Sequence, residues 1–307
     1  LSGVIKDKKR ELASIISNEM GKPISQAIGE IEKCIRLLNY YQDNSKRILS
    51  NKVINSESEK CYVTYQPIGI VLGVMPWNFP FWQVFRFAIP TIMAGNGAIL
   101  KHSSNVQGCA FSIESCFQVS GFPSNIFRNI SIKAKNVKHV IKNPLIKGVS
   151  LTGSTPAGKS VAKTAGKYIK KTVLELGGSD PYIILEDANL DIALKSCIDG
   201  RILNTGQSCI SAKRIIVVDK LYNKFLEMLE KKLSEKIMGD PMDNVDIGPM
   251  VTKKARDEVH DQVIRSVDAG ASIILGGFIP DLPGSFYPIT LLSDVEPGTP
   301  AFDEEIF

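Results

Sequence analysis

From residue 68 onward, short apolar runs alternate with helical stretches, and this alternation constrains the fold more than any other feature. The apolar runs lie at 68–75, 97–100, 126–130, 148–151 and 171–175. Helical patterns fill the intervals between them, at 81–94, 107–118, 134–141 and 156–168. Strands and helices that alternate at this rhythm are typical of βαβ units, which build a parallel sheet covered by helices on both faces. The sequence therefore predicts an α/β fold.

A second α/β stretch follows the first. It is expected to contain strands at 182–186 and 214–218, a helix at 190–203, and long amphipathic helices around 220–236 and 252–269. Gly177-Gly178 separates the two stretches and is the best candidate for a hinge between two domains.

Two helical patterns, at 4–20 and 24–48, precede the first strand. In the second of them apolar residues recur at spacings of three and four, which places them on one face of a helix: Ile24, Ile28, Ile31, Ile35 and Leu38. After a polar turn at 56–59, residues 61–67 alternate in polarity and predict an exposed strand that ends at Pro67.

Composition excludes several classes of protein. The chain is 44% hydrophobic and 22% charged, as an ordinary globular protein is, and its net charge of +5 is too weak to indicate nucleic-acid binding. Its most apolar segment, 68–100, is interrupted by prolines and polar residues, so we expect no membrane span. Six cysteines without CxxC pairs and three scattered histidines predict neither disulfides nor a metal site, and favour the cytoplasm. Leu1 and Phe307 both suggest cuts through a longer coding sequence.

Cys209 is the first candidate for chemistry. Most free cysteines are small buried hydrophobes, and the other five in this chain fit that description. Cys209 instead ends the polar segment Asn204-Thr205-Gly206-Gln207-Ser208-Cys209, between a predicted helix and a predicted strand. A thiol there is exposed and close to backbone N–H donors, which suits a nucleophile.

Three other segments have a chemical interpretation beside a structural one. Glu175 ends a strand before two glycines, where a side chain enters the ligand crevice of an open sheet, although for this residue alone an ordinary surface glutamate is the more common case. Asn78, between Pro76 and Pro80, either stabilises its loop or donates to a reacting oxygen. The segment 153–158 follows a strand and opens a helix, a phosphate-binding context, but it matches neither GxGxxG nor a P-loop.

Together and in order, these segments resemble the NAD(P)-dependent aldehyde dehydrogenase superfamily over essentially all 307 residues. The matching landmarks are Pro76-Trp77-Asn78-Phe79-Pro80, Leu100-Lys101, Thr152-Gly153-Ser154-Thr155, Glu175-Leu176-Gly177-Gly178, Gly206-Gln207-Ser208-Cys209 and Glu304-Glu305-Ile306-Phe307. The resemblance implies a Rossmann-type dinucleotide-binding domain at 1–48 and 68–176, part of an oligomerisation element at 49–67, and an α/β catalytic domain at 177–307 that is incomplete at its C-terminus.

The resemblance also implies catalytic roles. Cys209 would attack an aldehyde as a thiolate, and Asn78 with the Cys209 N–H would stabilise the resulting oxyanion. Glu175 would be the general base for hydrolysis of the thioester, and the chemistry needs no metal. The intact protein is expected to be a homo-oligomer that acts on a small aldehyde.

Contacts with NADP or NAD are implied for Trp77, Lys101, Ser104, Gly153, Ser154, Glu305 and Phe307. Ser154 would approach the pyrophosphate and Lys101 the adenosine ribose, while Glu305 and Phe307 would hold the nicotinamide ribose and ring. NAD-preferring members often carry an acid three residues after the lysine, where this chain has Ser104. Because no anion at this position repels the 2′-phosphate of NADP, we expect NADP to be used at least as well as NAD.

The substrate is indicated by Arg86, a charged residue within an otherwise apolar helix pattern. A surface arginine is the plain alternative, but the position resembles the carboxylate-binding arginine of succinate-semialdehyde dehydrogenases. Some of those enzymes carry a second arginine six residues before the nucleophile, where this chain has Leu203. The three histidines are expected to be structural or surface residues.

Two alternatives stay open at this point. One is a broad-range or CoA-acylating aldehyde dehydrogenase, in which coenzyme A takes the place of water. The other is an inactive truncated chain that only folds or binds nucleotide.

Overall fold

The computed structural model describes residues 1–307, which divide into two compact units. The first contains Leu1–Ile15 and Ile28–Leu176, and the second contains Ile16–Ala27 and Gly177–Phe307. The division after Leu176 coincides with the glycine pair at 177–178. Among the helices, none has both the length and the apolar character that crossing a bilayer requires.

The first unit is built on a five-stranded sheet in the order β5-β4-β3-β6-β7. All neighbouring strands pair in parallel, as the alternation of strands and helices predicted. The strands are β3 (Ile70–Met75), β4 (Gly97–His102), β5 (Phe127–Asn129), β6 (Ile146–Thr152) and β7 (Lys171–Glu175). Both faces of such a sheet are covered, which explains the continuous apolar runs in the sequence.

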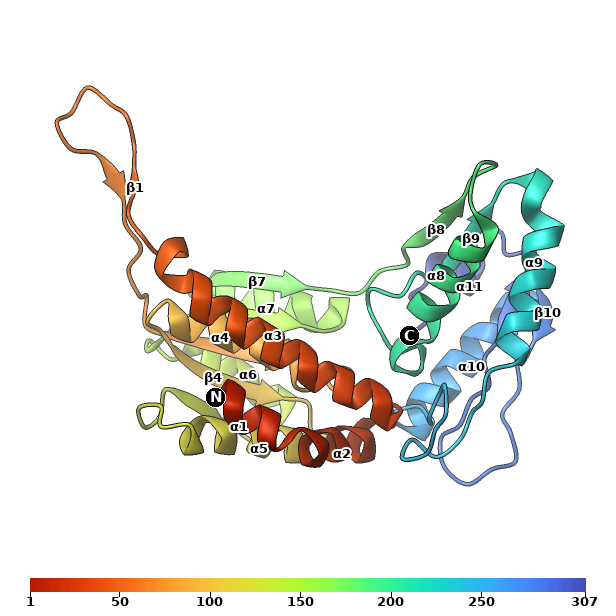
Figure 1. Cartoon of the computed structure of the whole chain (residues 1–307), viewed down its shortest axis with the longest axis horizontal. Helices are drawn as coiled ribbons and strands as arrows, with labels where there is room; N and C mark the ends of the chain where they lie inside the picture. The colour runs from red at the N-terminus through yellow and green to blue at the C-terminus, as the bar shows by residue number, and fades with distance from the viewer. The chain divides into compact units, whose positions relative to one another are not determined.

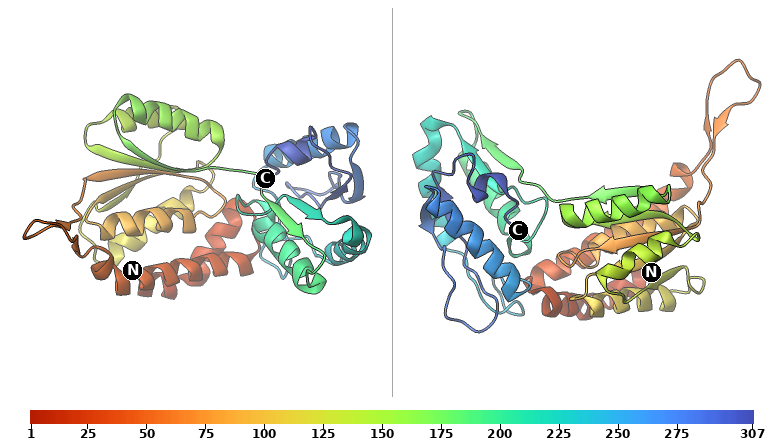
Figure 2. Two further views of the ribbon diagram at one scale, coloured as in Figure 1. Left: turned by 90° about the horizontal axis from the view of Figure 1, so that it is seen from above. Right: turned by 180° about the vertical axis from the view of Figure 1, so that it is seen from behind.

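Helices cover both faces of this sheet. Figure 2 shows α7 in light green on the face opposite α4 in orange. The helices are α1 (Ser2–Asp7), α2 (Lys9–Met20), α3 (Ile24–Ile48), α4 (Trp82–Met93), α5 (Gln107–Val119), α6 (Val137–Lys142) and α7 (Thr155–Lys167), with a short 3-10 turn η1 (Ala134–Asn136) before α6. α4 packs so closely on β3 that a Cβ at Gly73 would lie 2.4 Å from the Phe87 ring. The helical pattern expected at 4–20 is divided in two at Lys8.

The core of the first unit has two layers, one on each side of the sheet. On the α4 and α5 side, the Phe85 and Phe117 rings stack with their centroids 6.2 Å apart. On the α6 and α7 side, a buried cluster joins β3 and β6 to these helices and includes Leu72, Val149 and Val161. Burial of this apolar surface is the main source of stability for such a sheet.

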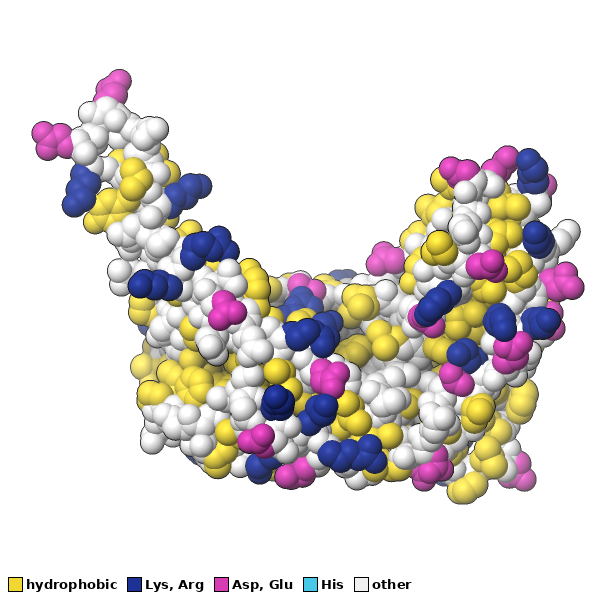
Figure 3. All heavy atoms as spheres, viewed as in Figure 1, with side chains coloured by type: hydrophobic (Ala, Val, Ile, Leu, Met, Phe, Trp, Pro, Cys, Tyr) yellow, Lys and Arg dark blue, Asp and Glu magenta, His cyan; other side chains and the backbone are white.

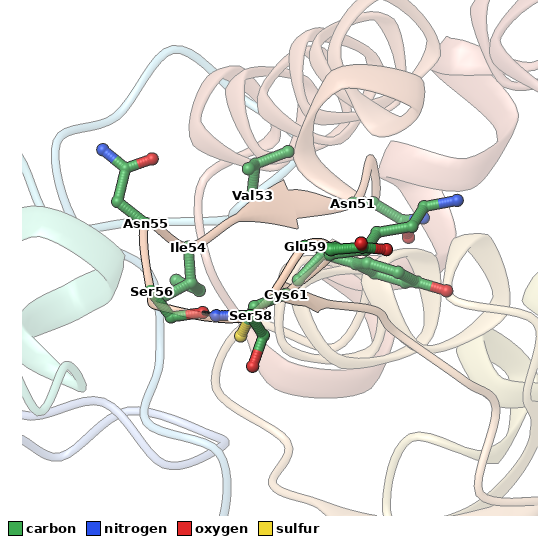
Figure 4. Close-up of a pocket in the computed structure, with 10 residues that line it drawn as sticks. Asn51, Val53, Ile54, Asn55, Ser56, Ser58, Glu59 and Cys61 are labelled. Atoms are coloured by element: carbon green, nitrogen blue, oxygen red, sulfur yellow. Dashed lines mark hydrogen bonds between the residues drawn. The ribbon is translucent and has the colours of Figure 1, made fainter.

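An exposed hairpin follows α3 and extends away from the sheet (Figure 1). It consists of β1 (Lys52–Val53) paired antiparallel with β2 (Tyr62–Val63). The strand expected over 61–67 is thus only two residues long. The hairpin surrounds a hollow of about 370 Å³, at whose bend Ser58 N–H donates to Ser56 Oγ over 3.3 Å (Figure 4).

The second unit has two small sheets. β8 (Pro181–Ile184) and β9 (Arg214–Val217) pair in parallel, and β10 (Ser272–Leu275) and β11 (Leu291–Ser293) pair antiparallel. Its helices are α8 (Leu190–Ile202), η2 (Leu203–Gly206), α9 (Asp219–Ser234), α10 (Lys253–Asp268) and α11 (Pro300–Asp303). The pattern predicted β8, β9 and the three long helices but not β10 or β11. A buried cluster around Phe225 and Ile198 joins α8 and α9 to the strands.

Ile16–Ala27 falls in the second compact unit, whereas the sequence placed it with residues 1–48 in the dinucleotide-binding domain. Hydrogen bonds that a helical pattern does not reveal connect it to the second unit. Ile24 N–H donates to the Pro241 carbonyl over 2.7 Å, and the Gln26 amide donates to the Asp246 carbonyl over 3.2 Å.

Charged side chains of both signs are interspersed over the face drawn in Figure 3. No group of three or more His, Cys, Asp or Glu side chains is arranged to hold a metal ion, and all six cysteines are free.

Candidate active site

The carboxyl edge of the first unit's sheet has the geometry of a ligand-binding crevice. β3 is the first strand of this sheet along the chain. β4 and β5 are then added on one side of β3, and β6 and β7 on its other side. In open α/β sheets, ligands bind outside the carboxyl ends of the strands where the order reverses, here between β3 and β6. Asn78 follows β3, Ser154 follows β6, and Glu175 ends β7.

The turn that carries Asn78 is held by His102, whose ring is 1% exposed. His102 Nδ1 lies 2.9 Å from the Ser103 nitrogen and 3.2 Å from the Met75 carbonyl at the end of β3. Nε2 lies 2.9 Å from the Pro80 carbonyl. Asn78 itself is 3% exposed. His102 therefore fixes the segment in which Asn78 lies. The sequence predicted only that His102 is a structural or surface residue.

Glu30 caps the helix that follows this turn. Its Oε1 accepts from Phe81 N–H and Trp82 N–H, each over 2.8 Å, at the start of α4. A carboxylate at a helix N-terminus satisfies free N–H groups and opposes the positive end of the helix dipole. Glu30 is only 4% exposed, and it lies about 50 residues earlier in the sequence, so the spacing gave no sign of this contact.

Arg86 and Glu175 form an ion pair, with Arg86 Nη2 2.6 Å from Glu175 Oε1. Arg86 projects from α4, and Glu175 ends β7, which is anchored to β6 because Gly153 N–H donates to the Glu175 carbonyl over 3.0 Å. The Arg86 and Glu175 side chains are 40% and 49% exposed. The sequence singled out both residues for separate roles and did not indicate that they touch.

Lys33 is a second cation beside Arg86 that sequence reasoning missed. Its Nζ lies 4.0 Å from the centroid of the Trp82 ring, one helical turn before Arg86. Partial burial lowers the pKa of Lys33, and the Arg86 charge lowers this pKa further. The two cations are therefore close enough to influence one another.

Of the residues that the resemblance assigned to the cofactor, Lys101, Ser104, Gly153 and Ser154 lie at the same carboxyl edge, whereas Glu305 and Phe307 belong to the second unit. Ser154 is the exposed N-cap of α7, where free N–H groups and the helix dipole favour an anion. Lys101 lies near the end of β4, and burial lowers the pKa of this lysine. Ser104 is exposed in the turn after β4. This arrangement fits a dinucleotide with a further phosphate, because cationic and N–H groups are present and Ser104 adds no carboxylate.

In the second unit, the loop before Cys209 has an unusual backbone. Asn204, Thr205 and Gly206 have φ values of 62°, 56° and 73°, so three successive residues are left-handed. Such a conformation costs a residue other than glycine roughly 1–2 kcal/mol. The structure compensates with hydrogen bonds: Asn204 Nδ2 donates to the Gln207 carbonyl over 2.8 Å, and Gly248 N–H donates to Thr205 Oγ1 over 3.1 Å.

Two basic side chains hold the same loop. The Lys213 side chain has no exposed surface, and its Nζ donates to the Ser208 and Cys209 carbonyls over 3.0 and 2.8 Å. Burial lowers the pKa of Lys213, while Glu305, whose Oε1 is 3.7 Å from Nζ, opposes that change. Arg201 donates to the Gly206 carbonyl over 2.7 Å, and burial lowers its pKa to about 10. Arg201 is therefore protonated at neutral pH.

The chain's last residues lie against this loop within the second unit. Arg201 Nη2 is 3.3 Å from the Ile306 carbonyl, and a Cβ at Gly177 would lie 1.8 Å from Glu305 Oε2. Only glycine leaves room for Glu305 there. Ile306 and Phe307 line a largely apolar cavity of about 690 Å³, and Cys209 is not among its lining residues.

The predicted site residues are thus divided between the units. The first unit holds Trp77, Asn78, Arg86, Lys101, Ser104, Gly153, Ser154 and Glu175, and the second holds Cys209, Glu305 and Phe307. Leu203, which takes the place of the second arginine of some succinate-semialdehyde dehydrogenases, is 38% exposed at the start of η2.

The strand order and the residues at the sheet's carboxyl edge define a dinucleotide-binding α/β protein with a cysteine loop in its second unit. The chain belongs to the aldehyde dehydrogenase family, whose profile matches residues 1–307. This result confirms the family and the fold that the sequence motifs indicated.

Individual relatives are similar to this chain over nearly its whole length. A probable succinate-semialdehyde dehydrogenase [NADP(+)] of Synechocystis sp. is 45% identical over 305 residues, which are 99% of this chain and 67% of that protein. A succinate-semialdehyde dehydrogenase [NADP(+)] of Deinococcus radiodurans is 41% identical, and the match covers 63% of that protein. The crystal structure of succinic semialdehyde dehydrogenase from Streptococcus pyogenes with NADP+ superposes with a TM-score of 0.97 at 36% identity, over 99% of this chain and 67% of that one. The chain spans about two thirds of the length of these relatives.

Proposed function

We propose that the protein containing this chain oxidises succinate semialdehyde to succinate, with NADP as the preferred cofactor. The observation that carries the proposal is Arg86, a guanidinium on α4 beside the carboxyl edge of the sheet, where it already holds a carboxylate, that of Glu175. A guanidinium recognises a carboxylate through a planar pair of N–H donors. The relatives named above as succinate-semialdehyde dehydrogenases support the same substrate.

Cys209 is proposed to act as the nucleophile. Its Sγ forms a bond to the aldehyde carbon, and the aldehyde oxygen takes the negative charge. Asn78 Nδ2 and the Cys209 N–H donate hydrogen bonds to that oxygen and stabilise it most when the charge is greatest. NADP, when bound, supplies the acceptor for the hydrogen that leaves the carbon with its electron pair. A thioester on Cys209 results.

Glu175 is proposed to act next, as the general base. It takes a proton from a water molecule while that water's oxygen attacks the thioester carbon. The C–S bond then breaks, Cys209 leaves as a thiolate, and the substrate is released as a carboxylic acid. Glu175 finally returns its proton to solvent, so the enzyme is unchanged after each cycle.

The cofactor is proposed to lie along the carboxyl edge of the first sheet. Ser154 and Gly153, at the start of α7, are placed to meet the pyrophosphate, and Lys101 the adenosine ribose. Ser104 contributes no negative charge against a 2′-phosphate, so NADP is used at least as well as NAD. Trp77 is assigned to the cofactor cleft, and Glu305 and Phe307 are assigned to the nicotinamide ribose and ring.

The hairpin at 49–67 is proposed to join two copies of the intact protein. Val53, Tyr62 and Tyr65 on it are 76%, 47% and 53% exposed, and an exposed sheet edge with apolar side chains favours association. We place the protein in the cytoplasm, since six free thiols suit a reducing compartment.

Substitution of Arg86 tests the substrate assignment. In Arg86→Ala, KM for succinate semialdehyde should rise at least about tenfold, as loss of a charged hydrogen bond predicts, while KM for butanal changes little. NADPH formation with each aldehyde gives the two KM values, and Cys209→Ala serves as the blank. Equal effects on both aldehydes would exclude Arg86 as the anchor, and a preference for neutral aldehydes would revive the broad-range alternative. If coenzyme A captured the thioester in preference to water, the CoA-acylating alternative would be favoured.

A further inference from the structure

The structure joins the two residues to which the proposed function gives opposite tasks. Arg86 is the anchor for the substrate carboxylate, and Glu175 is the base that hydrolyses the thioester. Arg86 Nη2 lies 2.6 Å from Glu175 Oε1. The guanidinium that substrate needs is therefore already bound to a carboxylate of the protein itself.

A substrate carboxylate and the Glu175 carboxylate present the same chemical group to Arg86. Two carboxylates on one guanidinium repel one another, so binding of the second weakens the first. The existing pair is easily exchanged, because the Arg86 and Glu175 side chains are 40% and 49% exposed and ion pairs in solvent are weak. No covalent bond changes in this exchange.

We propose that the substrate carboxylate displaces Glu175 from Arg86 and thereby releases the base for hydrolysis of the thioester. The inference rests on the proposed function and deepens it, since it makes substrate recognition and base release a single event. An aldehyde without a carboxylate leaves the ion pair intact. Selectivity for the charged substrate then arises partly at the hydrolytic step, and not only in binding.

Lys33 strengthens the argument that a second carboxylate is accommodated near Arg86. Its ammonium lies over the Trp82 ring, and the Arg86 charge influences its pKa. The positive charges of Arg86 and Lys33 thus offset the repulsion between the substrate carboxylate and Glu175. This favours entry of the substrate carboxylate before Glu175 has left.

Binding of succinate tests the competition without any turnover. Isothermal titration calorimetry would compare succinate affinity for the wild type, Glu175→Gln, Arg86→Gln and the control Glu32→Gln. The control removes an equally exposed, ion-paired carboxylate that is bound to Lys9. We expect Glu175→Gln to bind succinate about two- to fivefold more tightly, as the small strength of exposed ion pairs implies, and Glu32→Gln to match the wild type.

The outcomes separate this inference from the proposed function. Equal succinate affinity of the wild type and Glu175→Gln, both lost in Arg86→Gln, would overturn the competition and leave the anchor standing. Affinity that is unaffected by Arg86→Gln, or absent from the wild type and Glu175→Gln alike, would overturn the anchor and this inference with it.

Release of the base is tested by dividing the substrate into two parts. Propanal supplies the aldehyde and formate the carboxylate of succinate semialdehyde. Mass spectrometry of quenched protein would follow how fast the propionyl thioester on Cys209 disappears, in formate and in chloride at equal ionic strength. Formate should accelerate this hydrolysis at least about twofold in the wild type and not in Arg86→Gln. An unchanged rate in the wild type would contradict the release.

Discussion

The two units hold their proposed catalytic residues by different means. In the first, Asn78 and Glu175 lie at the ends of paired strands, so the sheet itself sets their places, with His102 and Glu30 as local supports. In the second, Cys209 follows a loop of left-handed residues whose conformation depends on side-chain tethers such as Lys213. We therefore expect the sheet edge to tolerate changes in a side chain, and the cysteine loop to lose stability when a tether is removed.

The largest expected effect separates function from stability at the sheet edge. Asn78→Ala removes a proposed oxyanion donor from a turn that His102 fixes through the Pro80 carbonyl. We expect kcat to fall about 10²- to 10³-fold, the usual loss for such a donor, with the unfolding midpoint lowered by no more than a few degrees. Kinetics and calorimetry on the same preparation provide both values. A kcat within a few-fold of wild type would remove Asn78 from the mechanism.

In the second unit the same kind of truncation should affect folding and activity together. Lys213→Met leaves the Ser208 and Cys209 carbonyls without their buried donor, which costs about 1–3 kcal/mol. Both the free energy of unfolding and kcat should fall, and Lys213→Arg should recover part of each. Lys220→Met is the matched control, since Lys220 forms an exposed pair with Glu186. If Lys213→Met behaved like Lys220→Met, the loop would not depend on this tether.

Cofactor choice is proposed to depend on Ser104, a single side chain at the sheet edge. Ser104→Asp introduces a carboxylate where the 2′-phosphate is proposed to lie, and like-charge repulsion should reduce kcat/KM for NADP relative to NAD at least about tenfold. Initial rates with each cofactor measure the ratio. Because the sheet sets the backbone here, stability should not change. A strong preference of the wild type for NAD would contradict the assignment of Ser104.

The smallest expected effect concerns acid stability in the second unit. Burial pushes the pKa of Asp246 upward, but hydrogen bonds from Ile237 N–H and Lys236 hold it below its ordinary value of 3.8. A carboxyl with a lowered pKa stabilises the fold above that value, and the contribution is lost as pH falls through the folded-state pKa.

Asp246→Asn should therefore be less stable than the wild type by about 1 kcal/mol at neutral pH, and the difference should shrink once pH falls below the ordinary value of 3.8 and vanish only below the lower folded-state pKa. Denaturant unfolding at several pH values measures it. Asp243→Asn, at an exposed position in the same segment, serves as the control. A difference that is independent of pH would show that the ionised form of Asp246 is not what stabilises the segment.

The same contrast explains what could be predicted from sequence. The five parallel strands, the helices between them and the site residues at strand ends follow from periodicity and from ordered motifs, since each signal is local. The Arg86–Glu175 pair, the Glu30 cap and the His102 contact join residues that no local pattern relates. The contact between the Gln26 side-chain amide and the Asp246 carbonyl, which places Ile16–Ala27 in the second unit, likewise joins residues more than 200 positions apart. β10 and β11, each of three or four residues, are too short to give a periodic signal.

Trapping the covalent intermediate tests the central claim most directly. A reaction of the protein with succinate semialdehyde and NADP would be quenched in acid, digested and examined by mass spectrometry. The account predicts a succinyl group on the sulfur of Cys209 in the peptide that contains it. An acyl group on another residue, or succinate formed while that sulfur stays unmodified, would contradict it.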